Sequence, residues 1–133
     1  MLPGNAETKS CVNRSSCILQ LSAVTKINDL AFYERGALTT VTLPEGLKEI
    51  GSQAFGYCSD LTEIVLPESL ESIGQEAFAF CSAIESVTVP ASVAYIGESV
   101  FYNCPALEGI WVDQENENYS SDESGVLFNK DKT

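Results

Sequence analysis

The sequence contains no histidine and few basic residues. Its 133 residues include 7 Lys or Arg against 19 Asp or Glu, which gives a formal net charge of −12. Without histidine the chain cannot form a Ser-His-Asp or Cys-His relay, and it has no imidazole ligand for zinc. So acidic a chain repels the phosphates of nucleic acids and of anionic membranes. We therefore expect no nucleic-acid partner, no cofactor, no metal and no enzymatic activity.

Long apolar runs are also missing. The chain has no stretch of the roughly 18 apolar residues that a membrane-spanning helix needs. The opening MLPGNAE has neither the basic nor the apolar region of a secretory signal peptide. With 44% apolar residues the chain is nonetheless too hydrophobic to be disordered, and its length suits one domain. We expect a folded chain without membrane insertion and without a signal peptide in this sequence.

A repeat of 23 residues dominates the sequence. Four phenylalanines recur at this interval, each with an Ile before it and, in the last three copies, a Gly after that Ile and a Cys after the Phe. One copy holds about eight apolar positions and cannot bury them alone, so the copies must stack around a shared core. The repeated residues are Phe32, Phe55, Phe78 and Phe101; Ile27, Ile50, Ile73 and Ile96; Gly51, Gly74 and Gly97, with Asn28 in the first copy; and Cys58, Cys81 and Cys104, with Arg35 in the first copy.

Each copy also contains a run of the form Leu-x-x-Val-x-Leu, at residues 38–43, 61–66, 84–89 and 107–112. Its alternation and its β-branched residues predict a short strand, which Pro44, Pro67 and Pro90 end in the first three copies. The intervening Ile-Gly-x-x-Ala-Phe-x-x-Cys stretch favours a turn followed by a short helical or 3₁₀ segment. The copies are therefore expected to form a solenoid with strands along one face.

These motifs resemble the BspA-like class of bacterial surface antigens within the leucine-rich repeat superfamily, over residues 24–113. The resemblance implies an α/β fold class: a right-handed leucine-rich-repeat solenoid with parallel strands on one face and turns or short 3₁₀ or helical segments on the other. It also implies an extracellular or cell-surface location on bacteria and a role in adhesion or partner recognition.

The two ends depart from the repeat. Residues 1–23 form an N-terminal segment in which Ile18 and Leu19 align with a strand, which we interpret as a degenerate capping strand. Residues 114–133 contain a polar loop and then Gly125–Phe128, which we interpret as the first strand of a hairpin whose return strand follows. A solenoid that ends there would leave the edge of its last strand uncovered. Such an edge favours homo-oligomer formation through the exposed ends.

The five cysteines fall into two groups. Cys58, Cys81 and Cys104 are one repeat apart, so they are expected to form a column of buried thiols about 5 Å apart, whereas a metal site would need thiolates that converge. Cys11 and Cys17 lie in a polar N-terminal segment. They form either a disulfide that ties the cap or two free thiols, and the sequence leaves both open.

The outward positions of the strands form the candidate ligand-binding site. Positions two, three and five of each run point away from the core because positions one, four and six point into it. Trp111, the only tryptophan, belongs to this set, and the small Gly109 beside it leaves it space. It is either an exposed contact for a protein or sugar or a residue covered by the C-terminal loop. The candidate site comprises Thr40, Thr42, Glu63, Val65, Ser86, Thr88 and Trp111.

Acidic residues are unevenly placed along the chain. From Glu49 to Asn129 there are fourteen Asp or Glu and no Lys or Arg. We interpret them as a solvated, self-repelling surface that is not focused on one face. A basic partner or Ca²⁺ is the alternative.

Two functions are consistent with these features. The first is a non-enzymatic recognition or adhesion module whose strand face binds a protein or a glycan. The second is a structural spacer or oligomerising repeat segment with no ligand of its own.

Overall fold

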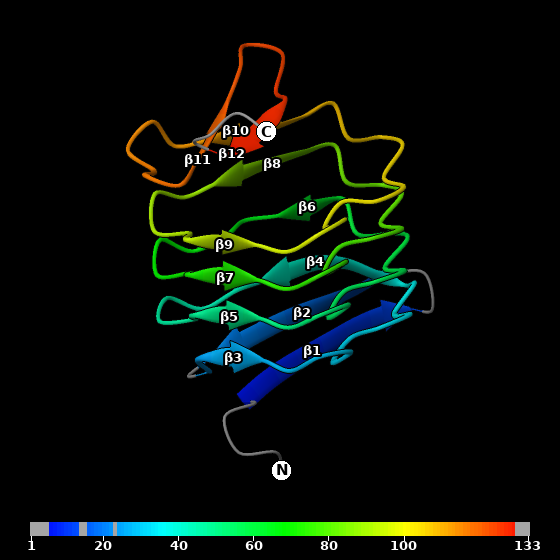
Figure 1. Ribbon diagram of the computed structural model, residues 1–133. Helices are drawn as coiled ribbons and strands as arrows, with labels where there is room; N and C mark the ends of the chain where they lie inside the picture. The colour runs from blue at the N-terminus through cyan, green and yellow to red at the C-terminus, as the bar shows by residue number, and fades with distance from the viewer. Residues whose placement is uncertain (1–5, 14–15, 23, 130–133) are drawn as a thin grey trace.

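The computed structural model describes residues 6–13, 16–22 and 24–129, with side chains from residue 24 onward. The chain forms a solenoid whose coils stack from the N-terminal end to the C-terminal end (Figure 1). The strands are β1 (Ala6–Asn13), β2 (Ser16–Ser22), β3 (Lys26–Ile27), β4 (Leu38–Thr42), β5 (Glu49–Ile50), β6 (Glu63–Ile64), β7 (Ser72–Ile73), β8 (Ser86–Val89), β9 (Tyr95–Ile96), β10 (Gly109–Val112), β11 (Tyr119–Ser121) and β12 (Leu127–Asn129).

The coils contribute strands to two opposite sides of the solenoid (Figure 1). On the strand side, β1-β2-β4-β6 form one sheet and β8-β10 form another. The pairs β2–β4, β4–β6 and β8–β10 are parallel. A second parallel sheet, β3-β5-β7-β9, was not predicted from the sequence. In this sheet each repeated Ile pairs with its own copy in the next coil, as Ile50 does with Ile73, and all but the last of these residues are buried. The leucine-rich-repeat solenoid is thereby confirmed.

The side that carries the Phe and Cys columns consists of turns. We expected turns or short helical or 3₁₀ segments on this side. The described residues form only the turns, with no helical or 3₁₀ segment. Two non-glycine residues in each coil have φ between 53° and 62°, and a helix cannot continue through a left-handed residue. The residues are Leu30 and Glu34, Gln53 and Tyr57, Glu76 and Phe80, and Ser99 and Asn103.

These turns are joined by hydrogen bonds between coils. The N–H of Phe55 donates to the carbonyl of Ala77 in the next coil (2.8 Å), whereas the N–H of Cys58 donates within its own coil to the carbonyl of Phe55 (3.3 Å). The alternation directs every second N–H along the solenoid axis. Hydrogen bonds between coils therefore compensate the cost of the left-handed residues, about 1–2 kcal/mol each.

The core consists of columns of identical side chains. The rings of Phe55 and Phe78 are 5.3 Å apart and parallel, and both residues are fully buried. The thiol of Cys81 donates to the carbonyl of Phe55 (3.1 Å), and Cys58 and Cys104 make the equivalent bonds to Phe32 and Phe78. Burial raises the pKa of Cys58 to about 11 and raises the pKa values of Cys81 and Cys104. The predicted column of buried thiols is confirmed, and these thiols stay protonated at neutral pH.

The repeated glycine is required by the close approach of adjacent coils. A Cβ on Gly74 would lie 2.6 Å from the backbone nitrogen of Ser52, and one on Gly97 would lie 2.6 Å from that of Gln75. Asn28 can replace glycine in the first copy because β3 is the edge strand of its sheet.

The N-terminal segment contains a hairpin. β1 runs antiparallel to β2, and β2 places Ile18 and Leu19 beside β4. The sequence indicated no strand at β1. The backbone register pairs Cys11 with Cys17, so the disulfide stays a prediction with a compatible backbone. Residues 1–5, 14–15 and 23 of this segment lie outside the described residues.

At the other end, the strand expected at Gly125–Phe128 is present as β12. Its partner differs from the expectation, because β12 is the return strand of a hairpin that begins with β11. The hydroxyl oxygen of Tyr119 accepts the N–H of Ile96 (2.8 Å), and that of Ser121 accepts the N–H of Val112 (2.9 Å). The hairpin thus satisfies N–H groups that a further coil would otherwise bind. Residues 130–133 lie outside the described residues.

Asn116 completes this cap. It occupies the slot that holds Leu47, Leu70 and Val93 in earlier coils, and it is 1% exposed. Its amide nitrogen donates to the carbonyls of Pro90 and Val93, and its amide oxygen accepts two N–H groups of the following loop. Within the described residues, these polar groups bond backbone groups at the C-terminal end of the stack, and homo-oligomer formation through the ends stays a prediction.

Candidate ligand-binding face

The strand face is the outward surface of β4, β6, β8 and β10 together with the residues that follow these strands. Alternation along the strands is as predicted: Glu63 is exposed and Ile64 is buried, and Thr88 is exposed between buried Val87 and Val89. All seven candidate residues lie on this face. The register sets Thr40 beside Glu63, Gly109 beside Ser86, and Trp111 beside Thr88.

The strand face is divided at one junction. Parallel ladders join β4 to β6 and β8 to β10, but β6 and β8 belong to different sheets. Val65 follows β6 directly at this junction. Its side chain is 65% exposed, more than any other large hydrophobic side chain in residues 24–129. An aliphatic residue left this open is available for contact with a partner.

Two shallow grooves adjoin at Val65. One, of about 380 Å³, runs between the coils of β4 and β6, and the other, of about 340 Å³, between the coils of β6 and β8. They share Glu63, Val65, Leu66 and Glu68. Six of the seven candidate residues line one groove or both; the seventh, Trp111, lines neither.

Trp111 is partly exposed and partly covered. Its side chain is 39% exposed. The indole ring lies over Gly109, where a Cβ would collide with it, and Gly125 of the C-terminal hairpin also approaches it. The space that Gly109 leaves is therefore filled by the ring itself. The ring is therefore partly covered by the cap and partly exposed, and its role as a contact for a partner stays a prediction.

Four carboxylates line the grooves, whereas most acidic residues of the described part of the chain do not. Glu45, Glu63 and Glu68 line the first groove, and Glu63, Glu68 and Asp113 line the second. The predicted site did not include Glu45, Glu68 or Asp113, because they lie in the loops that follow the strands. Stacking of the coils brings these loops together. The proline slot was the available signal, since Asp113 occupies it and the two glutamates follow it directly.

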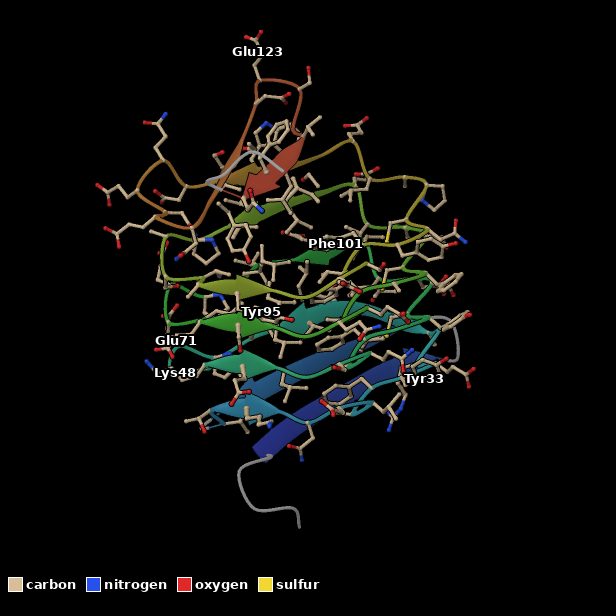
Figure 2. All side chains as sticks on the ribbon, viewed as in Figure 1. Tyr33, Lys48, Glu71, Tyr95, Phe101 and Glu123 are labelled. Atoms are coloured by element: carbon tan, nitrogen blue, oxygen red, sulfur yellow. The ribbon has the colours of Figure 1, made fainter. Side chains whose placement is uncertain are left out.

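Basic side chains of the described residues lie elsewhere. Lys26 pairs with Glu49 (3.8 Å) and Lys48 with Glu71 (3.3 Å) on the opposite sheet, where Figure 2 shows the second pair side by side. Arg35 lies over the Phe32 ring on the turn side. Residues 24–129 contain no group of three or more acidic or cysteine side chains that could hold a metal ion. The groove carboxylates are thus spread apart and without a basic neighbour in this part of the chain.

A column of partly exposed aromatic residues on the turn side was also missed. The rings of Tyr57 and Phe80 stack at 4.3 Å, and Tyr33 and Tyr102 pack edge-on at its ends. In the two outer coils the aromatic residue comes one position after the repeated Phe, whereas in the two inner coils it comes two positions after it. A search for strict 23-residue spacing therefore overlooks it.

The parallel stacked coils define the chain as a leucine-rich repeat solenoid. Residues 6–123 match the BspA type leucine-rich repeat region in six copies. The chain belongs to this family. The match extends beyond the resemblance seen at residues 24–113, into the N-terminal and C-terminal hairpins.

Solved bacterial structures share this fold. The T. pallidum leucine-rich repeat protein is 25% identical with a TM-score of 0.60, aligned over 77% of this chain and 67% of that one. The pneumococcal vaccine antigen PcpA is 32% identical with a TM-score of 0.65, over 90% of this chain but 35% of that one. A Bacteroides capillosus leucine-rich repeat protein is 26% identical with a TM-score of 0.64, over 85% and 96%. No curated protein matches the chain.

Proposed function

We propose that this chain is a non-enzymatic recognition module of a bacterial cell-surface or secreted protein, and that it binds a protein or glycan partner through its strand face. The observation that carries the proposal is the pair of adjoining grooves that meet at the exposed Val65. Outward residues that differ from coil to coil, over a core that repeats, provide a varied surface on a rigid support.

Family membership supports the location and the absence of catalysis. BspA-type repeats and the pneumococcal relative, which is a vaccine antigen, favour exposure on or outside the cell. The described part of the chain contains no helix with the length and hydropathy needed to cross a bilayer. The buried thiols are protonated and the sequence has no histidine, so we find no activated nucleophile with a base beside it among residues 24–129.

The proposal is tested by binding to a panel of extracellular-matrix proteins and glycans. The variant Val65→Ala/Thr88→Ala shortens two exposed side chains of the grooves, and Val126→Ala is the matched control, because Val126 is 48% exposed on the C-terminal hairpin. We expect a panel ligand whose affinity falls at least tenfold in the double variant and less than twofold in the control. A ligand that binds all three proteins equally contradicts the assignment to the strand face.

The alternative is a structural spacer or oligomerising segment. It is favoured by the regular stack, which corresponds to about a third of the longer pneumococcal protein. Light scattering on the same samples separates the two functions. A defined oligomer without a panel ligand supports the structural role, and a monomer that binds a ligand supports recognition.

A further inference from the structure

We infer that the two grooves of the strand face bind an extended, positively charged polypeptide segment. This inference rests on the proposed function and names the chemistry of its partner. The grooves lie on the two sides of the β6 coil, where they share Glu63, Val65, Leu66 and Glu68, and together they span the coils of β4, β6 and β8. A surface of this form suits a segment of chain better than a compact small molecule, because both grooves are shallow and open to solvent.

The negative charge around the grooves favours a positively charged partner. Glu45, Glu63, Glu68 and Asp113 line them, and each described ion pair lies on the opposite sheet. In residues 24–129 these four carboxylates therefore have no cation beside them. A partner with Lys or Arg side chains would supply the missing charge, and electrostatic complementarity of this kind speeds association and selects partners.

The spacing of the carboxylates favours a chain of cations over a single ion. Glu45 and Glu68 occupy the same position in successive coils, about 5 Å apart along the stack. The described residues contain no convergent group that could hold a metal. Separate Lys or Arg side chains along a polypeptide can each pair with a different carboxylate around the grooves.

The floor of the grooves favours a polypeptide over a sugar. In the first groove it is largely aliphatic, where Leu66 and Pro67 lie beside the exposed Val65. None of the described residues that line either groove is aromatic, so the grooves offer no ring on which a pyranose could stack. Aliphatic side chains of an extended segment would cover Val65 while neighbouring Lys or Arg residues face the rim.

The test uses the full chain and a fluorescent octapeptide of alternating Lys and Val, with binding followed by anisotropy at 50 and 300 mM NaCl. The comparison probes are an octapeptide of alternating Glu and Val and a chitosan oligomer, which is a cationic sugar chain. Glu63→Gln/Glu68→Gln removes two groove charges. Glu98→Gln/Glu123→Gln removes two exposed charges elsewhere and serves as the matched control; Glu123 lies at the outer tip of the C-terminal hairpin (Figure 2).

We expect the Lys-Val peptide to bind and the Glu-Val peptide not to bind. The affinity for the Lys-Val peptide should fall about tenfold in the groove variant, less than twofold in the control variant, and at least tenfold at the higher salt, because exposed charges are screened. Three results overturn the inference: no binding of the Lys-Val peptide at 50 mM NaCl, equal losses in both charge variants, or tighter binding of chitosan than of the peptide.

These results are distinguishable from failure of the proposed function. A panel ligand that is lost in Val65→Ala/Thr88→Ala but retained in Glu63→Gln/Glu68→Gln overturns the cationic partner and leaves strand-face recognition standing. A panel ligand unaffected by Val65→Ala/Thr88→Ala overturns both. Circular dichroism of each variant establishes that it has the wild-type fold.

Discussion

The turn side and the strand side of the solenoid share one 23-residue period, but they differ in how continuously adjacent coils are bonded. On the turn side the N–H groups of Phe32, Phe55 and Phe78 donate to the next coil at 2.8–2.9 Å, at three successive junctions. On the strand side the ladder is interrupted between β6 and β8. The turn side is therefore bonded across each of these junctions, whereas the strand side lacks a ladder at the β6–β8 junction, over which the second groove lies.

The two sides also differ in how strictly their residues repeat. Phe, Cys and Gly recur on the turn side because each contacts its own copy or the backbone of the adjacent coil. The outward strand positions change from Thr42 to Val65, Thr88 and Trp111 because they face solvent. Repetition thus marks packing, and variation within the repeat marks the surface available for recognition.

Phe78→Ala, on the turn side, is expected to have the largest effect on stability. Phe78 is fully buried between Phe55 and Phe101, so its loss should lower the free energy of unfolding by about 3–5 kcal/mol. Thr88→Ala on the exposed strand face should change it by less than about 0.5 kcal/mol. Urea denaturation of both variants measures the difference, and equal losses would contradict the separation of core and surface.

Alkaline pH should destabilise the turn side through its thiols. The unfolded Cys58 thiol loses its proton near pH 9, whereas the native thiol keeps its proton until about pH 11. The stabilisation from a raised native pKa is complete below pH 9 and is lost as the pH rises to 11, by at most about 1.4 kcal/mol per pH unit for each thiol. Denaturation from pH 8 to 11 checks this. Cys58→Ala should show a shallower loss than the wild type, and an identical pH profile would refute the prediction.

Gly74→Ala tests the close approach of the coils. The added methyl group would meet the backbone of Ser52, so we expect a loss of at least about 2 kcal/mol. Gly36→Ala is the control. Apart from residues 35 and 37, the nearest atom to a Cβ on Gly36 would be the Ser59 hydroxyl oxygen, 3.5 Å away. Thermal unfolding should separate the two variants, and a tolerated Gly74→Ala would show that adjacent coils can move apart.

The N-terminal end of the strand-side sheet is tested through Cys11 and Cys17. Their register in the β1–β2 hairpin predicts a disulfide under oxidising conditions, worth about 2 kcal/mol to the hairpin. Peptide mapping by mass spectrometry without reduction, after exposure to oxidised glutathione, should recover one linked pair at positions 11 and 17. The buried Cys58, Cys81 and Cys104 should remain free, and a linkage that includes one of them would contradict the prediction.

Ser99→Gly gives the smallest expected effect. Ser99 is exposed with φ of 56°, so glycine relieves left-handed strain but adds freedom to the unfolded chain. We expect the free energy of unfolding to rise by about 0.5 kcal/mol in Ser99→Gly. Ser59→Gly, outside the left-handed positions, should instead lose about 0.5–1 kcal/mol. Urea titrations of the two variants should move in opposite directions.

The sequence by itself determined the solenoid, its period, and which side chains point inward. Period and apolar spacing suffice because each coil can bury its Leu, Ile and Phe residues only against another copy of itself. The column of Cys58, Cys81 and Cys104 and the outward positions of the strands follow from the same argument, as does the placement of the seven candidate residues on one face.

Only the tertiary structure decided what lies between the coils and at the ends. The second sheet, the interrupted β6–β8 junction and the gathering of Glu45, Glu68 and Asp113 around the grooves depend on contacts between residues far apart in sequence. The cap depends on Asn116 satisfying backbone groups of the preceding coil, a role that its position in a leucine slot does not indicate. The repeated residues make the same contacts in every coil, so their structure can be predicted from the period. The contacts of residues that differ between coils depend on which side chains the fold brings beside them.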